Sequence, residues 1–180
     1  MRVITGTARG RRLKELEGMD TRPTTGKVKE AVFSIIQFDI EGRRVLDLFA
    51  GTGQLGIEAL SRGAASCVFL DTRKDAVKLI RENLEVTELA DQAQILQRDG
   101  LEYLAACREK FGLIFLDPPY QTGLLEKALQ RIAEFDILAP HGIIVAEGPL
   151  GTEMPEKAGN FHLYRSYRYG KIAVSIYHHD

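Results

Sequence analysis

From residue 44 onward, short apolar runs alternate with segments in which apolar residues recur every three or four positions. Runs of four to six apolar residues are typical of buried strands, and the longer periodic segments are typical of amphipathic helices. The expected strands cover 44–48, 66–70, 93–97, 113–116 and 142–146, and the expected helices cover 54–62, 74–86, 100–108 and 123–135. Strands separated by helices predict an α/β fold with a mostly parallel sheet and helices on both faces.

The two ends of the chain depart from this alternation. Residues 161–169 and 172–177 alternate apolar and polar positions around Gly170-Lys171, which predicts a hairpin and an antiparallel edge strand. Near the start, a Gly-rich stretch at 5–12 between apolar residues predicts a small β-hairpin. A helix with one apolar face follows and is capped by Thr24 or Thr25. We expect one domain over 1–180, with a hairpin-and-helix extension at 1–43 and a core at 44–180.

Charge is distributed unevenly, although the net charge is only −1. Residues 1–44 carry a net +4, residues 45–156 a net −8 and residues 157–180 a net +3. Basic ends around an acidic centre favour a nucleic-acid partner that contacts the ends, with Arg9, Arg11 and Arg12 as candidates. The alternative is that the basic ends only solubilise the protein.

Several function classes are not favoured. The two cysteines are too few for a disulfide framework or a zinc cluster, and none of the four histidines has metal-ligand spacing, so no metal is expected. No apolar run approaches the roughly 20 residues that a membrane helix needs. The first residues lack the apolar core of a secretory signal, so we expect a cytoplasmic protein without a membrane partner.

The first candidate ligand site is the Gly-rich turn that follows the strand at 44–48. Ala50, Gly51, Thr52 and Gly53 lie in this turn, and glycines there allow a ligand to approach the backbone closely. The spacing matches G-x-G-x-x-G, which alone would suggest a dinucleotide. Asp47 argues against a pyrophosphate at this place, and it suits a cationic amino group such as that of S-adenosylmethionine.

Two further carboxylates follow the next two strands. Asp71 ends the strand at 66–70, where a carboxylate can accept hydrogen bonds from both hydroxyls of a ribose. Asp99, followed by Gly100, is placed to accept from an adenine amino group, or to cap the helix at 100–108. The sequence leaves both roles open for Asp99.

The most specific motif is Asp117-Pro118-Pro119-Tyr120, directly after an apolar strand. An exocyclic amine on a base is a poor nucleophile because its lone pair is delocalised into the ring. Asp117 and the Pro118 carbonyl can accept its two hydrogens, and the prolines fix the direction of that carbonyl. Tyr120 offers a face on which an extruded base can stack.

The order of these motifs resembles that of the class I S-adenosylmethionine-dependent methyltransferases that modify amino groups. The chain also contains RPTT at 22–25, VKEAVF at 28–33, GIEALSRGA at 56–64 and YRYG at 167–170. These segments resemble, more closely, the bacterial 16S rRNA (guanine-N2)-methyltransferases of the small-subunit methyltransferase D family. The resemblance covers nearly the whole chain. Gly26, where an acidic residue is usual, and Gln54, where a small residue is usual, depart from the family pattern. Tyr120 is often Phe in relatives.

The resemblance implies a seven-stranded, Rossmann-like methyltransferase fold. It also implies methylation of a guanine N2, with guanine 966 as the expected target, in 16S rRNA of the 30S subunit or an assembly intermediate. The implied cofactor residues are Asp47, Ala50, Gly51, Thr52, Gly53, Asp71, Asp99, Gly100 and Asp117; the implied catalytic residues are Asp117, Pro118, Pro119 and Tyr120; and the expected RNA contacts are Arg9, Arg11, Arg12, Arg22, Thr24 and Thr25.

Two other functions remain as alternatives. An adenine-N6 DNA methyltransferase shares the DPPY motif, but it normally needs a separate target-recognition domain, for which 180 residues leave no room. A non-catalytic nucleic-acid binding module could keep the fold without the chemistry. Intact Asp47, Asp71 and Asp117 argue against that module.

Overall fold

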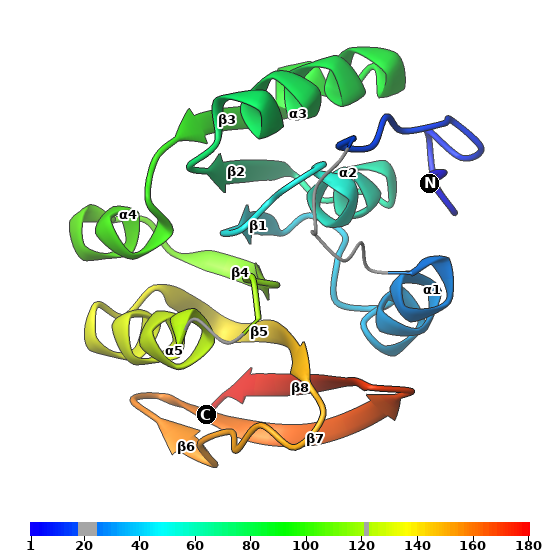
Figure 1. Cartoon of the computed structure of the whole chain (residues 1–180). Coiled ribbons are helices and arrows are strands. Elements are labelled where there is room, and N and C mark those ends of the chain that lie inside the picture. Colours follow the sequence, from blue (N-terminus) through cyan, green and yellow to red (C-terminus); the bar gives the residue numbers. More distant parts are fainter. Residues whose placement is uncertain (18–24, 121–122) are drawn as a thin grey trace.

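The computed structural model describes residues 1–17, 25–120 and 123–180, which form one mixed sheet with helices on both faces (Figure 1). The strands are β1 (Arg44–Asp47), β2 (Ser66–Asp71), β3 (Ala93–Gln97), β4 (Phe111–Leu116), β5 (Leu138–Pro149), β6 (Lys157–Ala158), β7 (Phe161–Tyr169) and β8 (Ile172–His179). The helices are α1 (Gly26–Ile35), α2 (Gln54–Ser61), α3 (Lys74–Thr87), the short 3-10 helix η1 (Ala90–Gln92), α4 (Gly100–Ala106) and α5 (Leu124–Glu134).

The sheet order is β3-β2-β1-β4-β5-β8-β7-β6. Strands β1 to β5 are parallel, whereas β8 pairs antiparallel with β5 and with β7. The order reverses between β1 and β4, and ligands of open α/β sheets bind at such a switch point. This topology confirms the expected α/β fold with an antiparallel edge.

The strands differ from the predictions in three main respects. β5 begins at Leu138 rather than 142, because Pro140-His141-Gly142 resembles a turn in sequence but continues the strand, with His141 at a positive φ of 63°. β4 begins two residues early, and its pairing with β5 shifts register between Phe111 and Leu113. The two-residue strand β6, which is too short to give a sequence pattern, makes the sheet eight-stranded.

Each face of the sheet has its own hydrophobic core. Apolar side chains of α1, α2 and α3 pack on one face, where the Phe33 ring lies 5.7 Å from that of Phe115. Side chains of α4 and α5 pack on the other face, where Phe161 and Tyr177 meet edge to face at 5.6 Å. No helix in the described part of the chain is long and apolar enough to cross a membrane.

Residues 1–17 form an arm that lies against α2, and we call it the N-terminal arm. Its two halves run antiparallel: the Val3 amide donates to the Arg11 carbonyl at 2.9 Å, and the Leu13 amide donates to the Met1 carbonyl at 2.8 Å. The expected hairpin is therefore present, with a single β-bridge between Arg2 and Arg12.

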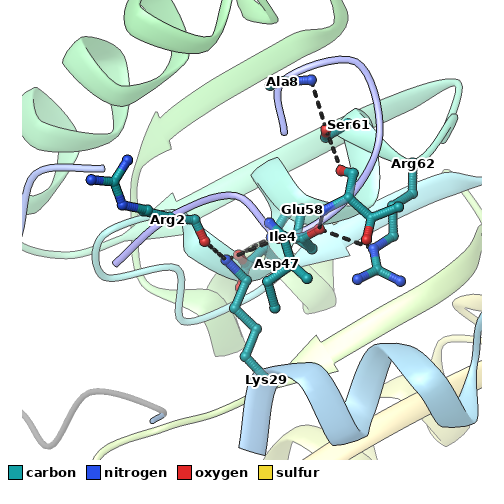
Figure 2. A network of polar contacts seen from close by, with 10 residues as sticks. Arg2, Ile4, Ala8, Lys29, Asp47, Glu58, Ser61 and Arg62 are labelled. Carbon is teal, nitrogen blue, oxygen red and sulfur yellow. Dashed lines mark hydrogen bonds and ion pairs between the residues drawn. The ribbon is translucent and has the colours of Figure 1, made fainter. Parts of the chain in front are cut away.

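A buried polar network fastens the N-terminal arm and α1 to α2 (Figure 2). Glu58 of α2 accepts from the amides of Ile4 and Thr5 at 2.8 and 3.0 Å, and its Oε1 lies 3.0 Å from Nζ of Lys29 in α1. Arg62 Nε lies 2.9 Å from the other oxygen of Glu58. Because the side chains of Lys29 and Glu58 are both fully buried, their charges neutralise one another inside the protein.

One turn further along α2, Ser61 repeats this contact with the arm. Its hydroxyl accepts from the Ala8 amide at 3.0 Å and donates to the Thr5 carbonyl at 2.7 Å. Its carbonyl accepts from the Thr7 amide at 2.9 Å. The middle of the N-terminal arm is therefore held through its backbone, while the side chains of Arg9 and Arg12 are exposed.

Candidate functional site

The Gly-rich turn at 50–53 lies at the switch point, between the carboxyl end of β1 and the start of α2. The Ala50 amide donates to the Leu70 carbonyl at the end of β2, at 2.8 Å. The Thr52 carbonyl accepts from the side-chain amide of Asn83 in α3, at 2.9 Å. The turn is therefore tied to two neighbouring elements rather than left as a free connection.

Gly56, the third glycine of the motif, sets how closely α2 approaches the sheet. A Cβ at this position would lie 2.4 Å from the Phe69 ring and 2.7 Å from Sγ of Cys67, so only glycine fits. The close approach lets the Gly56 amide donate to Oδ2 of Asp47 at 3.1 Å. The motif spacing thus serves helix–strand packing as well as the turn.

Asp47 is a buried carboxylate, with only 1% of its surface exposed. Burial raises its pKa to about 7; the hydrogen bond from Gly56 opposes this rise, and the charge of Asp71 adds to it. A group with such a pKa changes its protonation readily near neutral pH, and a cation nearby would favour the ionised form. The surroundings of Asp47 therefore suit a ligand that brings a positive charge.

Asp71 connects the end of β2 to the Gly-rich turn. Its Oδ2 accepts from the Gly51 amide at 3.0 Å, and its Oδ1 accepts from the Arg73 amide at 2.9 Å. The Arg73 side chain forms an ion pair with Oδ1 at 3.4 Å. Because each carboxylate oxygen can accept two hydrogen bonds, Asp71 keeps acceptor capacity for ribose hydroxyls, which fits an adenosyl group.

The Asp99 side chain caps α4, where it accepts from the Glu102 amide at 3.0 Å. The capping role left open by the sequence is confirmed, and the adenine contact stays a prediction. Gly100 follows, and a Cβ there would lie 2.9 Å from Cγ of Leu48. The start of α4 is therefore packed against the end of β1, beside the Gly-rich turn.

The DPPY motif follows β4 at the same edge of the sheet. β1 and β4 are adjacent, with Asp47 in register with Phe115, so Asp117 lies only two residues beyond that pair. Pro118 is buried, Asp117 and Tyr120 are half-buried, and Pro119 is exposed. The two motifs, about 65 residues apart in sequence, thus meet at the switch point.

Glu147, which the sequence reasoning missed, also lies beside this site. It follows Ala146, the partner of Leu116 in the β4–β5 pairing, and is 3% exposed. Asp117 follows Leu116 in the same way, so the two acidic residues come next to each other on neighbouring strands. A single acidic residue directly after the apolar run at 143–146 was the available signal.

The predicted RNA contacts fall in three groups. Arg9 and Arg12 are exposed on the N-terminal arm. Arg11 is also exposed, but its guanidinium donates to the Val86 carbonyl at 3.2 Å and lies 3.4 Å from Glu88. Thr25 caps α1 by accepting from the Val28 amide at 3.3 Å. Arg22 and Thr24 lie outside the described residues.

Known proteins resemble the chain over its whole length. The family described as "Conserved hypothetical protein 95" matches residues 1–178. YlbH of Bacillus subtilis, named as a candidate rRNA methyltransferase, is 45% identical over 180 residues, which cover 98% of each chain. Ribosomal RNA small subunit methyltransferase D of Escherichia coli is 31% identical over 180 residues, covering 100% of this chain and 90% of that protein.

Solved structures agree with the sequence relatives. The Escherichia coli protein yhhF, described as a candidate methyltransferase, superposes with a TM-score of 0.89 at 29% identity, covering 100% of this chain and 98% of that one. The candidate methylase HI0767 of Haemophilus influenzae gives 0.83 at 31% identity, covering 99% and 97%. These likenesses confirm the expected class I methyltransferase fold.

Proposed function

Because the chain belongs to the conserved hypothetical protein 95 family, which it matches over residues 1–178, we propose that it methylates ribosomal RNA. The expected substrate is the exocyclic N2 of a guanine in 16S rRNA, guanine 966, in the 30S subunit or its assembly intermediate. The expected cofactor is S-adenosylmethionine. The observation that carries the proposal is the meeting of DPPY with the Gly-rich turn at one switch point, beside Asp47 and Asp71.

The cofactor's adenosyl and amino-acid parts would be held by the carboxyl ends of β1 and β2. Asp71 would accept from the ribose hydroxyls, since it already orients the Gly51 amide at 3.0 Å. Asp47 would supply the negative charge for the cationic amino-acid part. Gly51, Thr52 and Gly53 would give the ligand access to the backbone. S-Adenosylmethionine supplies the activated methyl group.

The target guanine would be held by the DPPY motif. Asp117 and the Pro118 carbonyl would accept the two hydrogens of the exocyclic amine, which directs the nitrogen lone pair toward the methyl donor. Tyr120 would stack on the base after it has left the RNA stack. The chain's own contribution is therefore orientation and hydrogen-bond acceptance at one nitrogen.

We assign the RNA-facing role to the extension at 1–43 and the chemistry to the core at 44–180. The extension carries a high density of basic residues, whereas residues 45–156 are net acidic and would repel RNA away from the pocket. The N-terminal arm, held on α2, presents Arg9 and Arg12 to solvent as candidate phosphate contacts.

A methyl-transfer assay with three substrates tests this function. Purified protein with labelled S-adenosylmethionine would be offered 30S subunits, naked 16S rRNA and duplex DNA, and the modified nucleoside would be identified and mapped. N2-methylguanine at one rRNA position supports the proposal, and N6-methyladenine in DNA would replace it with the alternative enzyme. RNA binding without any transfer, in protein that binds the cofactor, would indicate a binding module.

A further inference from the structure

A continuous row of aromatic and cationic side chains covers one face of the outer hairpin. Tyr164 stacks on His178 with ring centroids 4.2 Å apart, and the Arg165 guanidinium lies 5.9 Å from the centroids of both Tyr164 and Tyr167. Tyr167 and Tyr169 are nearly parallel, 9° apart, with centroids separated by 6.5 Å. We call these five residues the aromatic ladder.

The ladder lies on the same face of the sheet as the helices α1, α2 and α3. Arg165, Tyr167 and Tyr169 pair with Ile176, Val174 and Ile172 of β8, which belong to the core on that face. Residues directly opposite each other in an antiparallel pair point to the same face. The short strand β6 pairs only with Phe161 and His162 of β7. From Arg165 onward, β8 is the one strand beside β7 among the described residues, so this row lies along the edge of the sheet (Figure 1).

Tyr167 of the ladder is in line with the candidate active site. Val174 pairs with Tyr167 on one side and with Glu147 on the other, and Glu147 comes next to Asp117. Asp117 and Tyr167 are thus three strand spacings apart, or about 14 Å. This distance places the tyrosines within a few nucleotides of any base that is held at Asp117.

The cations of the hairpin β7–β8 differ in their pairing from Lys157 of β6. Lys157 pairs with Asp180, but no ion pair among the described residues involves Arg165, Arg168 or Lys171. Charges on an edge strand prevent pairing with other sheets, which accounts for the basic residues. Tyr167 and Tyr169 pack against the core on that face but are only half-buried, so part of each ring stays open to a ligand. Parallel aromatic rings interleaved with arginine are the features by which proteins bind single-stranded RNA.

We propose that the aromatic ladder stacks the unpaired nucleotides beside the target guanine, an inference that rests on the proposed function. A base that enters a pocket leaves its neighbours without one stacking partner, and this loss opposes extrusion. Tyr167 and Tyr169 replace the lost contact, and Arg165 adds a cation over the face of Tyr167. The ladder therefore recognises single-stranded RNA next to the reactive base, while the N-terminal arm contacts phosphates.

The test replaces both tyrosines, as Tyr167→Leu with Tyr169→Leu, and measures methylation of 30S subunits. Loss of base stacking should raise KM about tenfold or more. The rate at saturating 30S and the affinity for S-adenosylmethionine should stay unchanged. The KM defect should persist at high salt, because stacking releases no counterions.

Three variants control this experiment. Tyr167→Phe with Tyr169→Phe keeps the rings and should retain the wild-type KM. Phe38→Leu removes an aromatic ring that is 91% exposed in the connection between α1 and β1 and does not belong to the ladder, and it should have no effect. If the double leucine variant does not fold, Arg165→Gln, at an exposed position, should still raise KM severalfold.

If the folded double leucine variant has the wild-type KM, the ladder proposal is overturned and the proposed function stays intact. If that variant does not fold, a wild-type KM in Arg165→Gln has the same meaning. If the wild type transfers no methyl group, the proposed function fails, and the ladder is then judged by direct binding. In that case a single-stranded fragment of 16S rRNA should bind the wild type at least several times more tightly than the double leucine variant, and equal affinities would overturn the ladder.

Discussion

Two buried carboxylates, Glu58 and Asp47, have opposite surroundings. Both are almost completely buried. Glu58 has Lys29 at 3.0 Å, Arg62 at 2.9 Å and two backbone amides of the N-terminal arm. Asp47 has one described donor, the Gly56 amide at 3.1 Å, and no described cation in contact.

The pKa values follow these surroundings. Burial alone would raise the pKa of Glu58, but Lys29, the Ile4 amide and Arg62 outweigh it and hold the pKa below its ordinary value. For Asp47 burial dominates and raises the pKa to about 7. Burial of a carboxylate therefore does not by itself mark a ligand site. The source of the counter-charge is more informative: the chain supplies cations to Glu58, whereas no described cation contacts Asp47, which is why we propose Asp47 as a ligand-binding residue.

Glu58→Ala removes the carboxylate that the chain neutralises internally, and we expect it to have the largest effect of the variants discussed. It leaves the Lys29 ammonium buried without its carboxylate and removes the acceptor for two amides of the N-terminal arm. The free energy of unfolding, measured by chemical denaturation, should fall by about 3–5 kcal/mol. Glu88→Ala removes the exposed pair with Arg11 and is the matched control, with an expected loss of about 1 kcal/mol or less. Equal effects of the two variants would contradict the structural role of Glu58.

Asp47→Asn tests the second carboxylate of this comparison through the pH dependence of the free energy of unfolding. In the native protein the pKa is about 7, against an ordinary 3.8, so between these values the native state holds a proton that the unfolded state lacks. Wild-type stability should therefore fall as pH rises from about 4 to about 7, by up to about 4 kcal/mol, and level off above that. The Asn variant lacks this dependence. Parallel stability–pH curves for the two proteins would show that Asp47 does not titrate in this way.

Asp117→Ala should separate catalysis from folding. Loss of one positioned acceptor for the target amine should lower single-turnover methylation of 30S subunits by roughly a hundredfold or more. The free energy of unfolding should change little, because Asp117 is half-buried at the end of a strand. The same substitution at the exposed Asp136 should leave the rate unchanged. A loss of less than tenfold at Asp117 would remove it from the proposed role.

Asp71→Ala should weaken the binding of S-adenosylmethionine, an effect smaller than that of Asp117→Ala on methylation. The ribose hydroxyls and the Gly51 amide would lose their acceptor, which should cost about 1–3 kcal/mol of binding free energy for S-adenosylmethionine. Calorimetric titration measures the effect on folded protein. Asp71→Asn, which keeps an acceptor oxygen, should lie between the wild type and the Ala variant. Unchanged affinity in Asp71→Ala would place Asp71 outside the site.

Arg9, Arg11 and Arg12, replaced together by Ala, should give the smallest effect at physiological salt. KM for 30S subunits should rise severalfold. Its dependence on salt concentration should weaken by an amount that corresponds to the loss of up to three phosphate contacts. The contribution of Arg11 should be the weakest, because its guanidinium already contacts Val86 and Glu88. Cofactor affinity should not change. Normal methylation at every salt concentration would mean that the N-terminal arm only solubilises the protein.

Most of the core could be predicted from sequence because its signals are local. Apolar runs located β1 to β5 within a few residues, and the alternation at 161–177 gave β7 and β8. The start of β5 was missed because Pro140 and Gly142 have the composition of a turn, while the pairing of Phe111 with Leu138 extends the strand. The Gly-rich turn and DPPY are also local patterns, so both can be recognised in the sequence without the fold.

The remaining features depend on contacts between distant segments. Glu58 lies in a helix that was predicted correctly, but its partners are Ile4, Lys29 and Arg62, of which two are far away in sequence. Glu147 gains meaning only from its strand neighbour, and the aromatic ladder only from its register with β8. In sequence these residues look like an ordinary helical glutamate, a strand end and an alternating strand.

The anchoring of the N-terminal arm on α2 has a consequence for synthesis of the chain on the ribosome. The amides of Ile4 and Ala8 bind Glu58 and Ser61, which are made more than 50 residues later. The N-terminal arm therefore leaves the exit tunnel before its contacts on α2 can form. We expect protection of the arm from proteases in stalled nascent chains to begin only once α2 has emerged.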